Sequence, residues 1–481
     1  MKRILLSSFI LLISFCSFSQ AGYVIKGKIK GIHDTICRFG NHFGDKQYVK
    51  DTAKVDHEGN FVFKGNKKLD GGIYLIVPPS NKYFEILIDK EQYFSFETDT
   101  TSKFVEHMKV KGSQDNIEYY KFQKFIAEEY TKADPMRKHI AKIREDSLAA
   151  ATTKKDSIKI LQEKLSAIDK EVDNYKNDYM KKNPNSFLTA IFKSQTDPVV
   201  PKPPVGNKDS LFEYHYYKAH YWDNIPLSDD RLLRTPVFHN KLKYYLDKVV
   251  LQHPDSLIKE ADWMVEQTKG NKETFKYIVW YITKTYETSN IMGLDAVFVH
   301  MGNLYYRTWK AFWVDSTTNL KIIHRVDILE PLLLGKQAPP LIMQDSTDKT
   351  YSLYETKAKY TVAVFWDPDC GHCQKVIPKL NEIYENKLKA KGVKIYSVDI
   401  EDDEAKWKKF IQEKKLNWIN VHDKYKQYYL RERYDIYSTP VIYLLDENKI
   451  IKAKRIDAEQ LEGFIEHIEK LKQLQKKETG N

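Results

Sequence analysis

Residues 21–110 alternate apolar and polar positions with the period of two that is typical of β-strands. Tyr23, Ile25 and Ile29 share one face of the first predicted strand. Further apolar runs, separated by Gly, Pro, Asn and Asp, occupy 61–63, 73–77, 84–88 and 93–96. The pattern predicts a β-sandwich-like domain over 20–112, and no catalytic residues cluster within it.

The apolar period becomes helical over 113–333. One stretch repeats apolar residues at spacings of three and four, which predicts a long helix with a continuous seam: Ile158, Leu161, Leu165, Ile168, Val172, Tyr175 and Tyr179. The seam fits a helix pair within the chain or a homodimer formed through this region. Four prolines over 198–204 predict a stiff extended loop. The aromatic-rich stretch 214–222 is more typical of a helix–helix core than of a ligand surface. We predict an all-α domain over 113–333.

Strand and helix patterns alternate from 334 to 481, as in α/β domains. The continuous apolar run Thr361–Phe365 predicts a buried central strand. The other predicted elements are helices over 371–390, 403–414 and 457–474, and strands over 393–400, 441–445 and 450–453. The predicted architecture is therefore multidomain, with a β-sandwich-like, an all-α and an α/β part.

Composition narrows the class of protein. The chain has 481 residues, 42% of them hydrophobic, which is enough for packed cores and excludes a mainly disordered chain. Lys and Arg number 77 against 66 Asp and Glu, giving a net charge of +11. Because the two signs are mixed along the chain and no aromatic–basic motif occurs, nucleic acid is not an expected partner.

Residues 1–19 have the features of a secretory signal peptide. Two basic residues precede the apolar run Ile4–Phe15, and Ser17 and Ser19 are small residues before the expected cut. The run is shorter than the roughly 20 residues that span a bilayer. We expect the mature protein to be exported.

Three of the four cysteines lie beyond the signal peptide: Cys37 alone, and Cys370 with Cys373 in a C-G-H-C pair. The pair follows the central strand and begins a helix, whose free N–H groups and partial positive charge stabilise a thiolate. Such a dithiol exchanges disulfides without a cofactor, with Cys370 attacking and Cys373 resolving the mixed disulfide. Cys37 is expected to be a small buried hydrophobe.

The segment from about 335 to 475 resembles the thioredoxin-fold domain of TlpA-like envelope thiol–disulfide oxidoreductases, in the alkyl hydroperoxide reductase/thiol-specific antioxidant superfamily. The resemblance rests on Trp366, the C-G-H-C pair, Pro378 and Thr439-Pro440 before a late strand. It implies a thioredoxin fold and a cis Thr439–Pro440 bond opposite the dithiol. It also implies that Thr439 and Pro440 line a substrate groove and that Trp366 packs beside the dithiol.

The two N-terminal regions resemble accessory domains of unknown function that precede such thioredoxin domains in Gram-negative envelope proteins. The resemblance implies a protein of the periplasm or cell envelope. Its implied partners are envelope proteins that contain thiols or disulfides, and a membrane or periplasmic thiol that donates or accepts electrons.

Three other interpretations compete with disulfide exchange. Structural zinc requires four ligands, and the chain has no second C-x-x-C pair. Thiol peroxidases of this superfamily place Thr three and Pro seven residues before the reactive cysteine, where this chain has Asp367 and Ala363. An envelope binding or scaffold protein with a non-catalytic thioredoxin-like domain would show no turnover of a disulfide substrate.

The direction of electron flow is open. His372 gives the Gly-His dipeptide of disulfide isomerases and, when protonated, favours the thiolate and a higher reduction potential. Asp367 and Asp369 flank Cys370 with negative charge, which opposes the thiolate.

No local general base is evident for the second cysteine. The position three residues after Cys373, where many relatives have a carboxylate, is Val376, and the position of the buried acid of thioredoxin is Val364. Glu382 and Glu401 are the nearby acids, and both are weak candidates.

Overall fold

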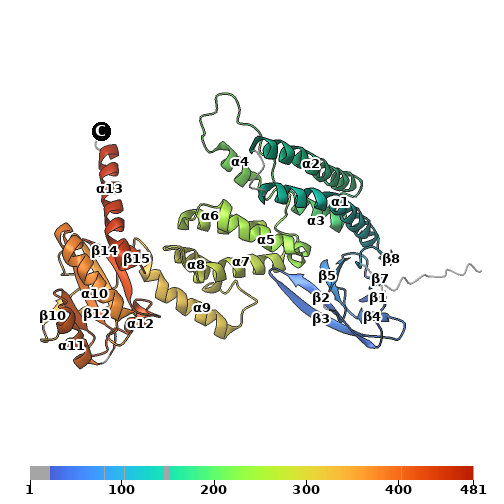
Figure 1. Cartoon of the computed structure of the whole chain (residues 1–481). Helices are drawn as coiled ribbons and strands as arrows, with labels where there is room; N and C mark the ends of the chain where they lie inside the picture. Colours follow the sequence, from blue (N-terminus) through green and yellow to red (C-terminus); the bar gives the residue numbers. More distant parts are fainter. Residues whose placement is uncertain (1–21, 81, 102, 146–150, 402, 480–481) are drawn as a thin grey trace, which may run out of the picture. The chain divides into compact units, whose positions relative to one another are not determined.

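The computed structural model describes residues 22–80, 82–101, 103–145, 151–401 and 403–479. The predicted signal peptide lies outside the described residues. The chain forms two compact units, Met1–Val249 and Val250–Asn481, whose elements are labelled in Figure 1.

Two four-stranded sheets form the β-part of the first unit, with strand orders β4-β1-β7-β8 and β3-β2-β5-β6. Phe39, Phe63 and Phe96 lie in the core of this part, which confirms the sandwich-like prediction. The strands are β1 (Tyr23–Lys30), β2 (Thr35–Phe43), β3 (Lys46–Val55), β4 (Asn60–Gly65), β5 (Gly72–Val77), β6 (Phe84–Ile88), β7 (Tyr93–Asp99) and β8 (Lys109–Lys111).

Two long helices follow, α1 (Gln114–Glu145) and α2 (Ala151–Lys182). They pack against each other, and Tyr175 of the predicted seam stacks on Phe125 of α1 with ring centroids 4.8 Å apart. The seam is therefore used for a helix pair within the chain. The first unit ends with α3 (Phe187–Ser194), α4 (Phe212–His220), η1 (Asp230–Arg234), α5 (Pro236–Tyr244) and η2 (Tyr245–Val249).

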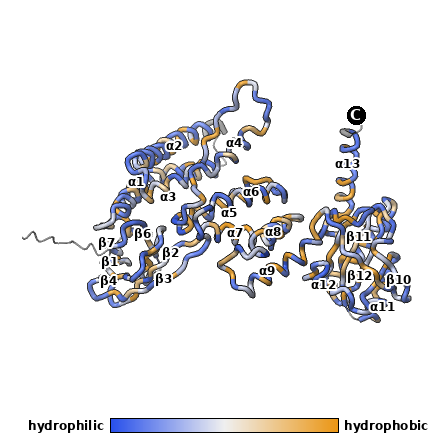
Figure 2. Tube along the Cα trace, turned by 180° about the vertical axis from the view of Figure 1, so that it is seen from behind, coloured by the Kyte–Doolittle hydropathy of each residue, from blue (hydrophilic) through white to orange (hydrophobic). Residues whose placement is uncertain are grey.

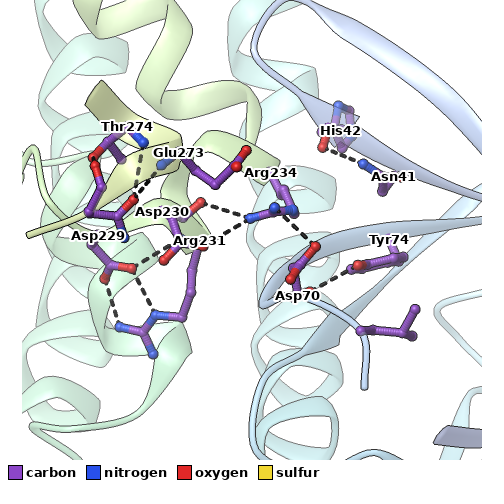
Figure 3. Close-up of polar contacts among 12 residues, drawn as sticks. Asn41, His42, Asp70, Tyr74, Asp229, Asp230, Arg231, Arg234, Glu273 and Thr274 are labelled. Carbon is purple, nitrogen blue, oxygen red and sulfur yellow. Dashed lines mark hydrogen bonds and ion pairs between the residues drawn. The ribbon is translucent and has the colours of Figure 1, made fainter. Parts of the chain in front are cut away.

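Two arginines of η1 form ion pairs with aspartates next to strands of the β-sheets. Arg231 forms an ion pair with Asp89 at 3.0 Å, beyond strand β6. Figure 3 shows Arg234 between Asp230 of its own helix and Asp70 before β5, and the Arg234–Asp70 ion pair measures 3.1 Å. Ion pairs of Arg231 and of the buried Arg234 thus join the sheets and the helices of the first unit.

The second unit opens with helices and continues into the C-terminal sheet. The helices are α6 (Pro254–Gln267), α7 (Lys272–Glu287), α8 (Asp295–Met301), η3 (Gly302–Tyr306), α9 (Ser316–Leu329) and η4 (Glu330–Leu332). The helices expected in one all-α region over 113–333 thus divide between the two units at Val249.

A seven-stranded sheet of order β10-β9-β13-β12-β11-β14-β15 forms the C-terminal domain. Its central strand β11 is buried throughout, parallel to β12 and antiparallel to β14. Figure 2 shows hydrophobic residues concentrated along β11 and β12. The strands are β9 (Ile342–Gln344), β10 (Thr350–Ser352), β11 (Tyr360–Trp366), β12 (Val393–Asp399), β13 (Ile419–His422), β14 (Val441–Asp446) and β15 (Ile451–Lys454).

Helices α10, α11 and α13 cover one face of this sheet and α12 packs on the other, which confirms the predicted α/β thioredoxin fold. Side chains of α10, α11 and α13 share one core with Val362, Val364 and Trp366 of β11. The helices and helical turns of the domain are α10 (Cys373–Ile383), η5 (Tyr384–Leu388), η6 (Lys389–Lys391), α11 (Glu404–Lys414), α12 (Leu430–Arg433), η7 (Ala458–Gln460) and α13 (Leu461–Thr479).

Helices α8 and α9 are joined to the C-terminal domain by buried ion pairs. Arg325 of α9 binds both carboxylate oxygens of the buried Asp435, with Nη2 3.1 Å from Oδ2. Lys454, at the end of β15, is buried and pairs with Asp295 of α8.

Within the described residues, no helix combines the length and the apolar composition needed to cross a membrane.

Candidate active site

The dithiol lies where the central strand meets a helix. Strand β11 ends at Trp366, and α10 begins at Cys373. The intervening loop is closed by hydrogen bonds from the Cys370 N–H to the Asp367 carbonyl at 3.2 Å and from the Gln374 N–H to the Cys370 carbonyl at 3.0 Å. Both sulfurs are therefore held in the first turn at the N-terminus of α10, where free N–H groups favour negative charge.

Cys370 is the more acidic thiol of the pair. Its partial burial opposes ionisation, but hydrogen bonds with the Thr439 side chain and from the backbone N–H groups of Cys373 and His372 outweigh it. These hydrogen bonds hold the pKa of the Cys370 thiol below its ordinary value. The half-exposed Sγ also lies 3.4 Å from the Thr439 carbonyl oxygen.

Cys373 has the opposite environment. Its side chain is buried in the core beside Trp366 and Ile377. Burial raises the pKa of the Cys373 thiol to about 12, although the Asp367 N–H donates a hydrogen bond to Sγ. A half-exposed acidic thiol beside a buried neutral thiol is the asymmetry that disulfide exchange requires.

The structure brings Thr439, Pro440 and Trp366 to this dithiol. The Thr439–Pro440 peptide bond is cis, as the resemblance implies. Trp366 is buried in the same core as Cys373 and donates from Nε1 to Ser397 Oγ at 2.7 Å. This hydrogen bond fixes the indole at the end of β11, directly before the active-site loop.

The charged residues of the loop are exposed to solvent or have polar partners. His372 is exposed at the N-cap of α10 and makes no side-chain capping hydrogen bond. Asp369, expected to oppose the thiolate, instead forms an ion pair with Lys406 of α11 at 2.7 Å. Asp367 accepts the Asp369 N–H through Oδ1 at 2.7 Å. Lys406 offsets the negative charge of Asp369, and the hydrogen bonds to Cys370 lower the pKa of its thiol despite both carboxylates.

Asp399 is a buried acid near the dithiol that sequence reasoning missed. It ends β12, pairs with Trp366 in the sheet register and is 1% exposed. Burial raises the pKa of its carboxyl to about 8. Glu401, the nearby candidate from the sequence, is exposed and paired with Arg431 at 2.7 Å. The available signal was an acid at the carboxyl end of a predicted buried strand.

One group in the described part of the chain has the ligand types and spacing for a metal ion. Its atoms belong to His33, Asp34 and His57 and lie within 4.8 Å of one another. All three residues are exposed on turns of the first unit, and His57 Nδ1 already lies 3.0 Å from Asp34 Oδ2. A surface ion pair accounts for this geometry, and the group lies in a different unit from the dithiol.

Family comparisons divide the chain into three matches. Residues 334–454 match the AhpC/TSA family, 152–330 match a domain of unknown function (DUF5106), and 23–119 match another (DUF4369). Among solved structures, a domain of a possible thiol-disulfide isomerase from Cytophaga hutchinsonii is 47% identical. The match covers 30% of this chain and 98% of that one, with a TM-score of 0.29. The thioredoxin domain of a Bacteroides vulgatus thiol-disulfide oxidoreductase is 33% identical, covering 28% and 96%, with a TM-score of 0.26.

A curated relative defines the family. The thiol-disulfide oxidoreductase ResA of Bacillus cereus is 31% identical over 142 residues, which are 29% of this chain and 80% of that protein. The match has the length of the C-terminal domain, in which the strand, the dithiol and the helix N-terminus meet. Through this domain, the chain belongs to the thioredoxin-like thiol-disulfide oxidoreductases of the AhpC/TSA family.

Proposed function

We propose that the protein exchanges disulfides with exported protein substrates through Cys370 and Cys373. The observation that carries the proposal is the unequal pair of thiols at the start of α10. Cys370 is half-exposed and its thiol pKa is lowered, whereas Cys373 is buried and its thiol pKa is raised to about 12. The thiolate is the attacking species in disulfide exchange, so the outer cysteine reacts first.

The reaction proceeds in two displacements that balance electrons and protons. The Cys370 thiolate attacks one sulfur of a substrate disulfide, forming a mixed disulfide and releasing the other substrate sulfur as a thiolate. Cys373 then loses its proton and attacks Cys370 Sγ, and the second substrate sulfur leaves. The substrate gains two electrons, and its two thiolates take up the proton of Cys373 and one proton from water, which replaces the one that Cys370 released on ionising; the protein becomes oxidised. The reverse sequence oxidises a substrate dithiol.

Thr439 and Pro440 form the wall of the substrate groove in this proposal. The Thr439 carbonyl lies 3.4 Å from Cys370 Sγ, so a peptide lying along this loop would bring its disulfide to the attacking sulfur. Trp366 fixes the loop from the core side. His372, exposed beside Cys370, tunes the reduction potential through its charge.

We place this activity in the periplasm or cell envelope of a Gram-negative bacterium. The predicted signal peptide over 1–19 supports export, and the exchange partners would be envelope proteins with thiols or disulfides. Mass spectrometry of the secreted chain tests this placement, since cleavage is expected before Gln20. A chain that keeps its first residues and stays in the cytoplasm would contradict it.

Single cysteine variants test the proposed roles. Cys370→Ser should abolish turnover of a disulfide substrate such as insulin, and Cys373→Ser should trap mixed disulfides that survive non-reducing electrophoresis. Cys37→Ser is the matched control, because that buried thiol lies in the other unit and should leave turnover unchanged. Full turnover by Cys370→Ser would refute the enzyme assignment and favour a binding or scaffold protein.

The direction of exchange follows from the reduction potential of the Cys370/Cys373 couple. The protein is equilibrated in thiol buffers of known reduction potential, and the free thiols of the protein are counted in each buffer. A potential near or above about −200 mV assigns an oxidase or isomerase, and one near or below about −270 mV assigns a reductase. A couple without reversible two-electron exchange would contradict the proposal itself.

A further inference from the structure

In the second displacement Cys373 must lose a proton, and neither cysteine of the pair can accept it. The Cys373 thiol must ionise to attack, yet burial holds its pKa at about 12. The positions at which related proteins place an acid, Val364 and Val376, are apolar here. If the proposed exchange reaction is correct, another buried base must serve Cys373.

Asp399 lies on the face of the sheet where Cys373 is buried. Side chains alternate between faces along a strand, and those of β12 at 393, 395, 397 and 399 share one face. Ser397 accepts the Trp366 indole N–H at 2.7 Å, and Val393 and Ile395 pack in the core that contains Cys373. Asp399 is therefore on the same face as the buried thiol, at the carboxyl ends of the parallel strands.

A single peptide unit links the two residues. The Ile400 N–H, directly after Asp399, donates to the Trp366 carbonyl at 3.1 Å. The next N–H along that chain, on Asp367, donates to Cys373 Sγ. The backbone N–H next to Asp399 and the sulfur of Cys373 thus contact the carbonyl and the N–H of the same Trp366–Asp367 peptide.

The carboxyl of Asp399 has one oxygen free for a proton. Oδ1 accepts the Glu401 N–H at 3.3 Å, whereas Oδ2 is buried and has no hydrogen-bond partner among the described residues. A buried carboxylate oxygen without a partner is costly, unless it binds a proton or serves the chemistry of a site. Its pKa of about 8 lets it exist in both forms near neutral pH.

The other titratable groups around Asp399 differ from it in burial or in hydrogen bonding. His422, its neighbour in β13, is buried against Trp407 of α11, and burial lowers the pKa of this imidazole. Other titratable groups near the site include Asp367 and His372 on the active-site loop, Glu401 with its partner Arg431, Asp369 with Lys406 and Asp403 from the α11 side, and the two cysteines.

We propose that Asp399 is the proton acceptor for Cys373 in the second displacement. As the Cys373 S–H bond breaks, its proton passes to the Asp399 carboxylate. The Cys373–Cys370 bond forms, and the bond from Cys370 to the substrate breaks with its electron pair on the substrate sulfur. The proton on Asp399 then neutralises that departing thiolate. In the reverse direction Asp399 returns the proton to Cys373.

Rapid-quench measurement of the two displacements tests this role. Release of the first and second substrate thiols is counted over pH 5.5–9.5 in the wild-type protein, in Asp399→Asn and in Glu401→Gln. Asp399→Asn should slow release of the second thiol about 100-fold at pH 7, the size expected for a lost general base. Release of the first thiol should be unchanged, and Glu401→Gln should match the wild type.

The pH profile distinguishes proton transfer from a structural role. The second rate should level off near pH 8 in the wild type, but rise tenfold per pH unit without a plateau in Asp399→Asn. An unchanged second rate and profile in a folded Asp399→Asn would overturn the proposal. If that variant does not fold, the carboxyl of Asp399 is titrated by NMR in the wild type, and a midpoint different from that of the rate would overturn it.

If the protein does not exchange disulfides at all, the same experiments give a different result from the one expected if only the role of Asp399 is wrong. A wild-type protein that releases no first thiol, or Cys370→Ser that retains turnover, would refute disulfide exchange itself. A wild type that performs both displacements, with Asp399→Asn doing so equally well, would refute only the role of Asp399.

Discussion

Asp399→Asn should make the second unit more stable at neutral pH. Burial raises the pKa of Asp399 to about 8 in the folded protein, against about 3.9 for an exposed aspartate in the unfolded chain. Between these two values the unfolded chain releases a proton that the folded protein keeps. Folding stability therefore falls as pH rises from about 4 to 8, and asparagine, which cannot ionise, removes this loss.

The size of the effect follows from the two pKa values. Each pH unit between them costs about 1.4 kcal/mol, so Asp399 destabilises the folded state at pH 7 by on the order of 4 kcal/mol. The gain from Asp399→Asn should be near zero at pH 4 and grow steadily toward pH 8. Asparagine has nearly the same shape and its Oδ1 can still accept the Glu401 N–H, so little packing is lost.

Urea unfolding read by hydrogen exchange of the β11 and β12 amides measures this gain, because buried strands exchange through unfolding of their own unit. Asp403→Asn is the matched control. Hydrogen bonds from the Lys406 N–H hold the pKa of exposed Asp403 below its ordinary value, so its contribution to stability is lost as pH falls. A stability difference for Asp399→Asn that is flat from pH 4 to 8, or a loss of stability at pH 7, would refute the reasoning.

Three further results are expected. Burial raises the pKa of the fully buried Cys37 thiol to about 12, so this thiol should not react with iodoacetamide in the folded protein. Mass spectrometry should therefore count at most two modified thiols in the native reduced protein and three in denaturant. Arg325→Ala should destabilise the second unit by about 3 kcal/mol in urea unfolding, because it removes one guanidinium from buried Asp435, and Arg325→Lys should restore part of this. Ser397→Ala should cost about 1–3 kcal/mol and alter the tryptophan fluorescence, because the buried indole N–H of Trp366 loses its acceptor.

The central elements of the C-terminal domain could be predicted because their patterns are long and strongly apolar. The buried run ending at Trp366, the dithiol and the following helix all have unambiguous signals. The short edge strands β9 and β10 have three residues each, too few to show a period. In the first unit, β3 is almost entirely exposed, so it contains no apolar run that could have indicated a strand.

Features that depend on tertiary contacts could not be predicted. The helices before and after Val249 have similar periodicity, and only packing partners assign them to different units. Asp399 likewise looks like any acid after a strand. Its role becomes visible once the register places it beside Trp366 and the helices α10 and α11 bury that face.

Because ion pairs join α8 and α9 to the C-terminal domain, the segment that folds as one unit is longer than the segment that matches the family. The AhpC/TSA match begins at residue 334, but buried Lys454 has its carboxylate partner, Asp295, on α8 and donates to the Leu332 carbonyl before that boundary. A fragment starting at 334 would keep the cation and lose both acceptors. We therefore expect α6–α9 and the redox domain to melt in one cooperative transition, and a fragment from Val250 to retain it.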